Sequence, residues 1–162
     1  MATASAESNA IKIICENRKA RFNYFITETF EAGLVLTGSE IKSIRLGHVT
    51  IAEGFVRAQN GELFIRQISI EQYSFNANPE YDAARPRKLL LNKREIAKLI
   101  TSVERKGLTL IPIKLYLKGG RAKLQIGLAK GKSAPDKRDT VKKREGERDC
   151  QVLNAVYTFE LR

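Results

Sequence analysis

Two pairs of apolar runs, each joined by a tight turn, limit this chain to an antiparallel β fold. The first pair flanks Asn60-Gly61, the dipeptide preferred in a two-residue type I′ hairpin turn, and the second flanks a glycine-containing turn at 118–121. The four runs are residues 49–58, 62–70, 108–117 and 122–129. Short strands, tight turns and few helices together predict a mainly β domain, a small closed antiparallel barrel with helical plugs.

A further strand and a short helix are predicted between the N-terminus and the first turn. The stretch 21–36 is rich in aromatic and β-branched residues, which favours a strand, with a bend at Gly33. The stretch 39–47 has Ser39 in front of its apolar residues and Gly47 behind them. These are the start and stop signals of a short helix.

A longer helix is predicted over residues 93–106. Asn92 can cap its start and Gly107 can close its end, and the apolar residues between them recur at helical spacing on one face. Before this helix, residues 75–87 are polar and contain two prolines, so they are predicted to form a loop.

The apolar pattern stops after Gly127. The stretch 130–148 is rich in lysine and arginine and has no apolar face beyond Val141, so it cannot pack into a core. We therefore expect a flexible N-terminus, a β-barrel domain, and a basic tail that is disordered when free. The three regions are residues 1–15, 16–131 and 132–162.

Positive charge is concentrated in one half of the chain. The whole sequence has a net charge of +11, but residues 85–148 alone carry 20 basic and 6 acidic side chains, net +14. Such a concentration is the electrostatic footprint of a polyphosphate ligand, with nucleic acid as the first candidate and an anionic membrane surface as the second. A surface that only kept the protein in solution would have both signs interspersed.

The composition argues against several other classes. The two cysteines, Cys15 and Cys150, are far apart and His48 is the only histidine, so the sequence predicts no disulfide scaffold, no metal site and no cofactor. No apolar run approaches the ~20 residues of a membrane span. The N-terminus lacks the basic start and apolar core of a secretory signal. We expect a cytoplasmic protein without membrane association.

No motif in the sequence forms a catalytic constellation. GLAKGKS, residues 127–133, looks like a phosphate-binding loop, but its first glycine comes one residue late and no helix follows directly. Glu28, Glu31 and Glu40 lie close in sequence, and an RNA-processing enzyme that uses these carboxylates is the alternative. The expectation is that the chain is not an enzyme.

Aromatic and basic residues lie side by side near the start of the predicted first strand. Phe22, Tyr24 and Phe25 adjoin Lys19 and Arg21. Such neighbours can hold a phosphate and stack an unpaired base. Because alternation along a strand buries one face, we expect Phe25 inside the barrel and Tyr24 outside it.

Four stretches, in this order, resemble the SsrA-binding protein, or small protein B, family. They are residues 17–45, 87–96, 123–132 and 136–145. The resemblance covers most of residues 16–148 and implies an oligonucleotide-binding-type barrel with a few helices and a basic tail. It also implies an adaptor, a monomer in its complex, that delivers the tRNA-like domain of transfer-messenger RNA to stalled ribosomes. A general ribosome-associated basic protein is the remaining alternative.

The resemblance implies RNA contacts at individual positions. Arg21, Lys88 and Lys123 can neutralise phosphates, and Glu31 can accept hydrogen bonds from base or ribose donors. Leu90 could pack on an exposed base or fill the barrel, and both interpretations stay open. With the aromatic and basic neighbours above, the predicted RNA-binding residues are Asn17, Lys19, Arg21, Tyr24, Glu31, Lys88, Leu90, Lys123, Lys130 and Lys132.

For the tail, the resemblance implies entry into the decoding region of the small ribosomal subunit and the mRNA channel, where the tail becomes helical. Its cations can pair with ribosomal RNA phosphates, and ordering on binding offsets part of that gain. The predicted ribosome-binding residues are Asp136, Lys137, Arg138, Lys142, Lys143 and Arg144.

Two places depart from the family pattern. Pro135 stands where the family has a ring-bearing residue, which leaves no ring for a stacking contact on ribosomal RNA. Residues 149–162 have a strand-like pattern with a single basic residue, where the family has a lysine- and arginine-rich helix. The charge argument does not account for this last segment.

Overall fold

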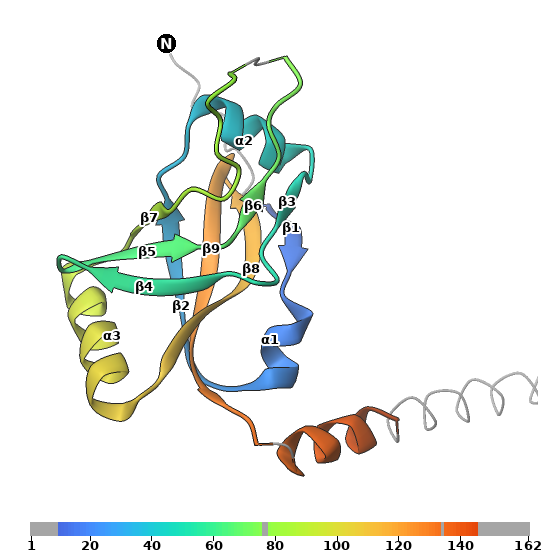
Figure 1. Ribbon diagram of the computed structural model, residues 1–162, viewed down its shortest axis with the longest axis vertical. Helices are drawn as coiled ribbons and strands as arrows, with labels where there is room; N and C mark the ends of the chain where they lie inside the picture. Colours follow the sequence, from blue (N-terminus) through green and yellow to red (C-terminus); the bar gives the residue numbers. More distant parts are fainter. Residues whose placement is uncertain (1–9, 76–77, 134, 146–162) are drawn as a thin grey trace, which may run out of the picture.

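The computed structural model describes residues 10–75, 78–133 and 135–145 (Figure 1). Within these ranges the chain forms mostly strands, with three labelled helices among them, and a further helix covers 135–145. The labelled elements are β1 Ile11–Glu16, α1 Arg18–Asn23, β2 Tyr24–Leu34, α2 Gly38–Arg45, β3 Val49–Thr50, β4 Phe55–Gln59, β5 Glu62–Arg66, β6 Ser69–Ile70, β7 Arg87–Leu90, α3 Lys93–Lys106, β8 Thr109–Lys118 and β9 Arg121–Gly131.

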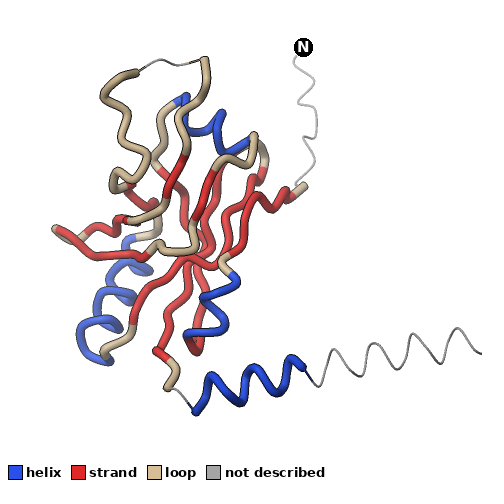
Figure 2. Tube along the Cα trace, turned by 45° about the vertical axis from the view of Figure 1, so that its right-hand side comes forward, coloured by secondary structure: helices blue, strands red, loops and turns tan. Residues whose placement is uncertain are grey.

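Hydrogen bonds close the larger sheet into a ring. Among the described residues its strand order is β1-β8-β4-β5-β7-β2-β9, and an additional pairing of β8 with β9 brings the last strand back to the second. The pairings in this ring are antiparallel. Figure 2 shows the strands gathered at the centre with the helices outside them. The predicted mainly β fold, a small closed antiparallel barrel, is confirmed.

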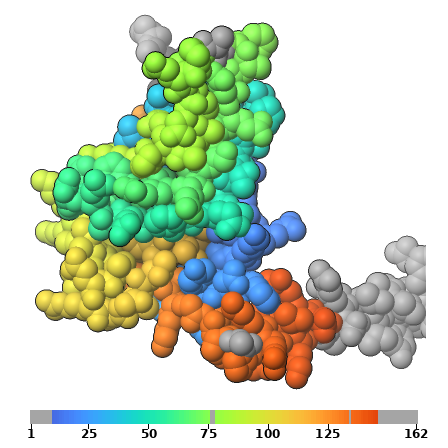
Figure 3. Space-filling model, in the orientation of Figure 1, coloured from blue at the N-terminus to red at the C-terminus, as the bar shows by residue number. Residues whose placement is uncertain are grey.

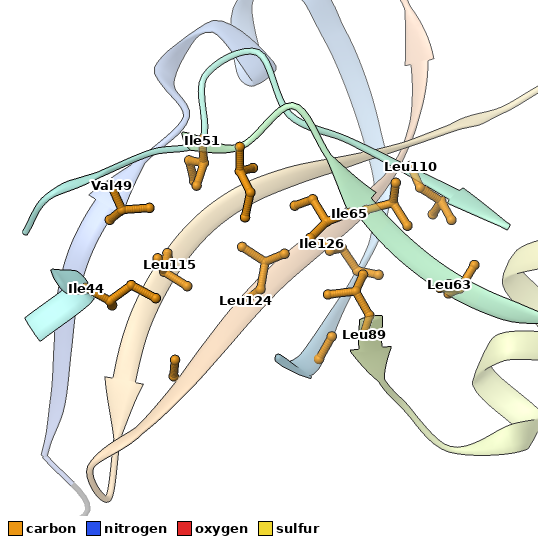
Figure 4. Packing of buried hydrophobic residues seen from close by; sticks show 14 of the residues in the cluster. Ile44, Val49, Ile51, Leu63, Ile65, Leu89, Leu110, Leu115, Leu124 and Ile126 are labelled. Atoms are coloured by element: carbon orange, nitrogen blue, oxygen red, sulfur yellow. The ribbon is translucent and has the colours of Figure 1, made fainter. Parts of the chain in front are cut away.

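Alternating side chains of β9 form one wall of the core. Leu124, Ile126 and Leu128 are at most 3% exposed, whereas Lys123 lies on the opposite face of the strand. Leu115 of β8 meets this wall from the neighbouring strand (Figure 4). Each fully buried leucine stabilises the fold by about 1.5–3 kcal/mol relative to an exposed one.

The predicted turns and the long helix are confirmed. Asn60 and Gly61 have φ angles of 52° and 74°, the two positive values that a type I′ turn requires. The second hairpin forms between β8 and β9. α3 begins after Asn92, whose backbone N–H donates to Glu95 at 3.1 Å, and ends at Gly107 in the left-handed conformation.

The strand predicted to begin at Arg21 begins later, because residues 21–23 belong to α1. Asn17 caps this helix: its Oδ1 accepts a hydrogen bond from the N–H of Ala20 at 3.1 Å. Ala20 is buried at 2% exposure. A good cap and a packed alanine therefore outweigh the strand propensity of the aromatic residues here.

Two further boundaries differ from the predictions. The short helix α2 is capped by Thr37 rather than Ser39, because Thr37 and Glu40 form a capping box. At the N-terminus, β1 pairs with β8, so residues 11–15 of the segment expected to be flexible belong to the sheet. The capping box is a local signal that the prediction overlooked, whereas the pairing of β1 depends on a strand about 100 residues away.

A buried ion cluster joins α2 to the start of β7. The side chains of Glu40 and Arg87 are fully buried, with Nη2 of Arg87 2.8 Å from Oε1, and Arg85 adds a second ion pair at 2.6 Å. Burial tends to raise the pKa of Glu40, but hydrogen bonds from Arg85, the Thr37 backbone and Arg87 outweigh it and lower the pKa to about 2. The loop that precedes β7 is thereby fixed to α2.

We expect Glu40→Gln to lower the free energy of unfolding by about 3–5 kcal/mol, because Arg87 would stay buried with an uncompensated charge. Urea denaturation near neutral pH, followed by circular dichroism, measures the loss. The matched control is Glu53→Gln, which breaks an exposed ion pair with Lys19. That control should cost no more than about 1 kcal/mol. Equal losses in the two variants would contradict the argument.

Candidate nucleic-acid interface

The outer face of β2, β8 and β9 brings a carboxylate together with lysines. The strand register sets Gly33 of β2 opposite Lys123 of β9, and Lys123 opposite Tyr116 of β8. The Tyr116 hydroxyl donates a short hydrogen bond to Oε2 of Glu31, and Nζ of Lys118 lies 3.6 Å from the same oxygen. Glu31 and Lys123, two predicted RNA contacts, therefore share one surface.

The carboxylate of Glu31 stays ionised at neutral pH. The hydrogen bond from Tyr116 lowers its pKa, partial desolvation opposes this, and the charges of Lys118 and Lys123 lower the pKa further. Burial and the adjacent Glu31 raise the pKa of Tyr116 to about 12, so its hydroxyl remains a donor. The result is an acceptor held in one orientation beside cations, an arrangement suited to donor groups at a nucleotide edge.

Leu90 lies on the same outer face, across Gly33 from Lys123. Gly33 pairs with both residues, and a Cβ on it would come within 3.3 Å of the Leu90 Cβ. Leu90 is 52% exposed, whereas Leu89 is 1% exposed and fills the barrel. The interpretation that Leu90 fills the barrel is therefore wrong. A groove of about 390 Å³ runs past Leu90 and Lys123 to α2.

A second cationic surface lies at the start of β2. Phe25 is 49% exposed and Nζ of Lys132 lies 4.8 Å from the centroid of its ring. Lys130 pairs with Phe25 in register and is exposed, as is Arg21. Tyr24 is half-buried and packs against the smaller core cluster beneath α1. The expectation of Phe25 inside and Tyr24 outside is therefore wrong, because Tyr24 fills that cluster.

Like Glu31, three further predicted RNA-binding residues, Asn17, Lys19 and Lys88, have partners within the protein. Asn17 is 6% exposed, and its Nδ2 donates to the carbonyl of Pro112 at 3.0 Å while its Oδ1 caps α1. Lys19 forms an ion pair with Glu53 at 2.7 Å, and Lys88 forms a short ion pair with a glutamate of β5. The two lysine pairs are partly exposed and weak, so a phosphate can replace either glutamate. Both polar groups of the Asn17 side chain, by contrast, are used in buried hydrogen bonds within the protein.

The helix at 135–145 is fastened to the barrel by Lys132. Its Nζ donates to the carbonyl of Arg21 and to Oγ1 of Thr140, each at 3.1 Å. The helix begins at residue 135, shortly after β9 ends at Gly131, and in Figure 3 its orange surface adjoins the blue surface of α1. Lys132, predicted as an RNA contact, therefore links the barrel to the basic helix.

The helix has one acidic cap and an exposed basic surface. Asp136 accepts hydrogen bonds from the N–H and the hydroxyl of Ser133 at 3.2 and 2.5 Å, and the hydroxyl bond contributes most to lowering its pKa. From the first turn of the helix, the Asp136 side chain thus holds Ser133 at the helix N-terminus. Four of the five predicted basic residues are exposed and Lys137 is half-exposed. They are Lys137, Arg138, Lys142, Lys143 and Arg144.

The tail was expected to be disordered when free, whereas the structure has a helix at 135–145. The order of the free tail in solution stays a prediction. The atypical segment 149–162, which includes Cys150, lies outside the described residues.

The acidic residues considered for catalysis lie in separate environments. Glu28 pairs with Lys98 at 2.6 Å on the surface, Glu31 contacts Tyr116, and Glu40 is buried with its two arginines. In the part of the chain that the structure describes, no group of three or more His, Cys, Asp or Glu side chains could hold a metal ion. The three carboxylates do not form one site.

The GLAKGKS stretch is not a phosphate-binding loop. Residues 127–131 continue β9, and a Cβ on Gly127 would come within 2.7 Å of Ile113. Gly127 is therefore required by strand packing rather than by a ligand. Among the described helices none is both long and apolar enough to span a bilayer.

Sequence reasoning missed Tyr116 and Lys118 as part of this surface. The only available signal was a single ring within the mostly aliphatic run 108–117. The contact with Glu31 depends on the bend and register of the sheet, because Tyr116 and Glu31 are 85 residues apart.

A closed barrel with a cationic outer face and a basic helix after its last strand defines an RNA-binding protein of the oligonucleotide-binding class. The sequence profile of the family described as SmpB protein matches residues 14–155. This chain belongs to the SmpB protein family, and the resemblance seen in the sequence is confirmed.

Relatives and a solved structure support the assignment. The SsrA-binding protein of Thermosynechococcus vestitus is 51% identical over 145 residues, which cover 88% of this chain and 95% of that protein. The SsrA-binding protein of Limosilactobacillus reuteri is 47% identical over 157 residues, 97% of this chain and 100% of that protein. A chain of a structure described as "tmRNA-SmpB: a journey to the center of the bacterial ribosome" is 46% identical, with a TM-score of 0.62, over 74% of this chain and 85% of that one.

We expect Asn17→Ala to destabilise the fold, because two buried hydrogen bonds of its side chain are lost. The free energy of unfolding should fall by about 1–3 kcal/mol. Lys19→Ala, two residues away and exposed, is the control and should cost no more than about 1 kcal/mol. Thermal and urea unfolding measure both variants. An Asn17→Ala protein as stable as the wild type, but deficient in RNA binding, would show that this side chain acts on RNA rather than on α1.

Proposed function

We propose that this chain is an adaptor that binds the tRNA-like domain of transfer-messenger RNA and delivers it to stalled ribosomes for trans-translation. The observation that carries the proposal is the outer-face cluster of Glu31, Leu90 and Lys123 around Gly33, in a chain of the SmpB protein family. The adaptor acts in the cytoplasm, as a monomer in its complex, and performs no catalytic turnover.

The barrel recognises a folded RNA by shape. Lys123 and Lys118 neutralise phosphates, while the oriented carboxylate of Glu31 accepts from a base or ribose donor. Leu90 offers an exposed apolar contact beside them. At the other end of β2, Arg21 and Lys130 extend the cationic surface. Because only a few cations surround the fixed acceptor of Glu31, this surface favours binding of one folded RNA over binding of an arbitrary single strand.

The basic helix serves a second RNA. Its cations face solvent, so they are available to the ribosomal RNA of the decoding region and the mRNA channel. Because Lys132 holds the helix to the barrel through Arg21 and Thr140, the two RNA-binding surfaces stay connected. Recovery of the RNA that co-purifies with the protein tests the function: transfer-messenger RNA is expected, and ribosomal RNA alone would favour a general ribosome-associated protein.

We expect Lys123→Ala to weaken binding to a tRNA-like RNA and to reduce the slope of log K against log salt by about 0.7–0.9, because one phosphate contact is lost. Fluorescence anisotropy with labelled RNA across a salt series measures both quantities. Lys106→Ala, an exposed lysine at the end of α3, is the control and should change neither. If wild-type protein bound random single strands of equal length as tightly, the proposed function would be wrong.

Replacement of Lys137, Arg138, Lys142 and Lys143 by alanine should leave the affinity of the barrel for tRNA-like RNA nearly unchanged and abolish ribosome rescue. The reason is that the removed charges lie on the helix rather than on the barrel. A reconstituted translation assay that counts rescued ribosomes measures the second effect. The matched control replaces four exposed cations of α3, namely Lys93, Arg94, Arg105 and Lys106. Loss of RNA binding together with rescue would overturn this division of roles.

A further inference from the structure

An exposed aromatic pair lies on the loop between β6 and β7, away from the surfaces already described. Phe75 is 87% exposed, the most exposed large apolar side chain of the described residues. Its ring is 5.5 Å from that of Tyr73, with the two planes inclined at 54°. Phe75 is exposed and Tyr73 half-buried, so the Phe75 ring adds nothing to the core and offers a free aromatic face to a ligand.

One cation of α2, Lys42, contacts the aromatic pair. Nζ of Lys42 lies 5.4 Å from the centroid of the Tyr73 ring, and this lysine has no ion pair among the described residues. Arg45, one turn further along α2, donates to the carbonyl of Gly120 at 3.3 Å. Nearby, Glu71 is paired with His48 at 3.9 Å. An aromatic ring can stack on a nucleic-acid base, and an ammonium group can neutralise the neighbouring phosphate. A site that binds an unpaired base combines these two groups.

The loop that carries the rings is fixed at its base. The Tyr81 hydroxyl donates to the carbonyl of Ile70 at 2.7 Å, and the N–H of Ile70 donates to the carbonyl of Ala83 at 3.1 Å. Arg85 and Glu40 then join the loop to α2. In Figure 1 the loop and α2 stand together at one end of the molecule. The base of the loop that carries the rings is thus held in place, which limits the entropic cost of binding.

The aromatic pair also continues the proposed RNA surface. Ile41 of α2 lines the groove that contains Leu90 and Lys123, and the next residue, Lys42, contacts Tyr73. On the same helix, Arg45 reaches the β8–β9 turn, where Arg121 lines the groove. One helix therefore separates the groove from the rings, and RNA in the groove can reach across it.

We propose that Phe75 and Tyr73, with Lys42, form a second RNA contact that stacks an unpaired base of the same folded RNA. The inference deepens the proposed function and rests on it. RNA is favoured over a protein partner because the site consists of two rings beside Lys42 and adjoins a groove lined by Lys123 and Arg121, whereas a protein interface requires a wide, closely packed apolar area.

The test measures the affinity of a tRNA-like RNA with unpaired loops for Phe75 variants. Phe75→Ala should weaken binding by about 5- to 150-fold, the effect of one stacked base, with an unchanged salt slope because no charge is removed. Phe75→Tyr keeps a ring and should bind as the wild type does. Ile13→Ala on β1, which truncates another exposed apolar side chain, is the matched control.

Stacking can also be observed directly, because the chain contains no tryptophan. Phe75→Trp places a single indole at the site, and stacking on a base should quench its fluorescence when RNA is added. Ile13→Trp is the matched reporter and should not respond. No quenching at position 75, or equal quenching at both positions, would overturn the inference.

Parallel measurement of Lys123→Ala separates this inference from the proposed function. If Lys123→Ala weakens RNA binding and Phe75→Ala does not, the stacking contact is wrong and the function stands. If Phe75→Ala spares RNA binding but weakens binding to RNA-free ribosomal proteins, the rings serve a protein partner and the inference is again overturned. If wild-type protein shows no preference for the folded RNA, the proposed function itself fails.

Discussion

The buried carboxylate of Glu40 is the contact on which the geometry of the RNA surface depends. It belongs to α2, yet it binds Arg87 at the start of β7 and Arg85 in the preceding loop. Such a cluster adds little net stability over an apolar core, but each charge becomes costly without its partners. The cluster therefore selects one arrangement of α2, β7 and the loop. Leu90 and the aromatic pair are both positioned by it.

The register of β2, β8 and β9 is the second constraint. Leu124 and Ile126 are buried, so Lys123 and Gln125, which alternate with them, must face outward, and a shift of one residue would bury the lysine and expose Leu124 and Ile126. The same alternation places Glu31 outside beside the buried Ala32. Core packing and the RNA-binding surface are thus set by one pattern, and neither can change alone.

Features with a local physical cause could be predicted from the sequence. The turn at Asn60-Gly61 and the helix between Asn92 and Gly107 depend on neighbouring residues, and both were predicted correctly. The features that were missed depend on distant partners. The predicted RNA contact of Asn17 stays a prediction, but the sequence did not reveal that its side chain also reaches Pro112, 95 residues away. Phe25 and Tyr24 were reversed because the cluster that Tyr24 fills lies beneath α1.

The positive charge of residues 85–148 lies where the protein is proposed to bring two RNAs together. Two polyanions repel each other, and their approach requires neutralising charge at the point where they meet. Residues 85–148 supply net +14, and Lys132 lies between the barrel and the basic helix with hydrogen bonds to both. A short connection keeps the second surface at high effective concentration once the first has bound. Two moderate interactions can then act as one strong attachment, which suits an adaptor that must join two RNAs and later release them.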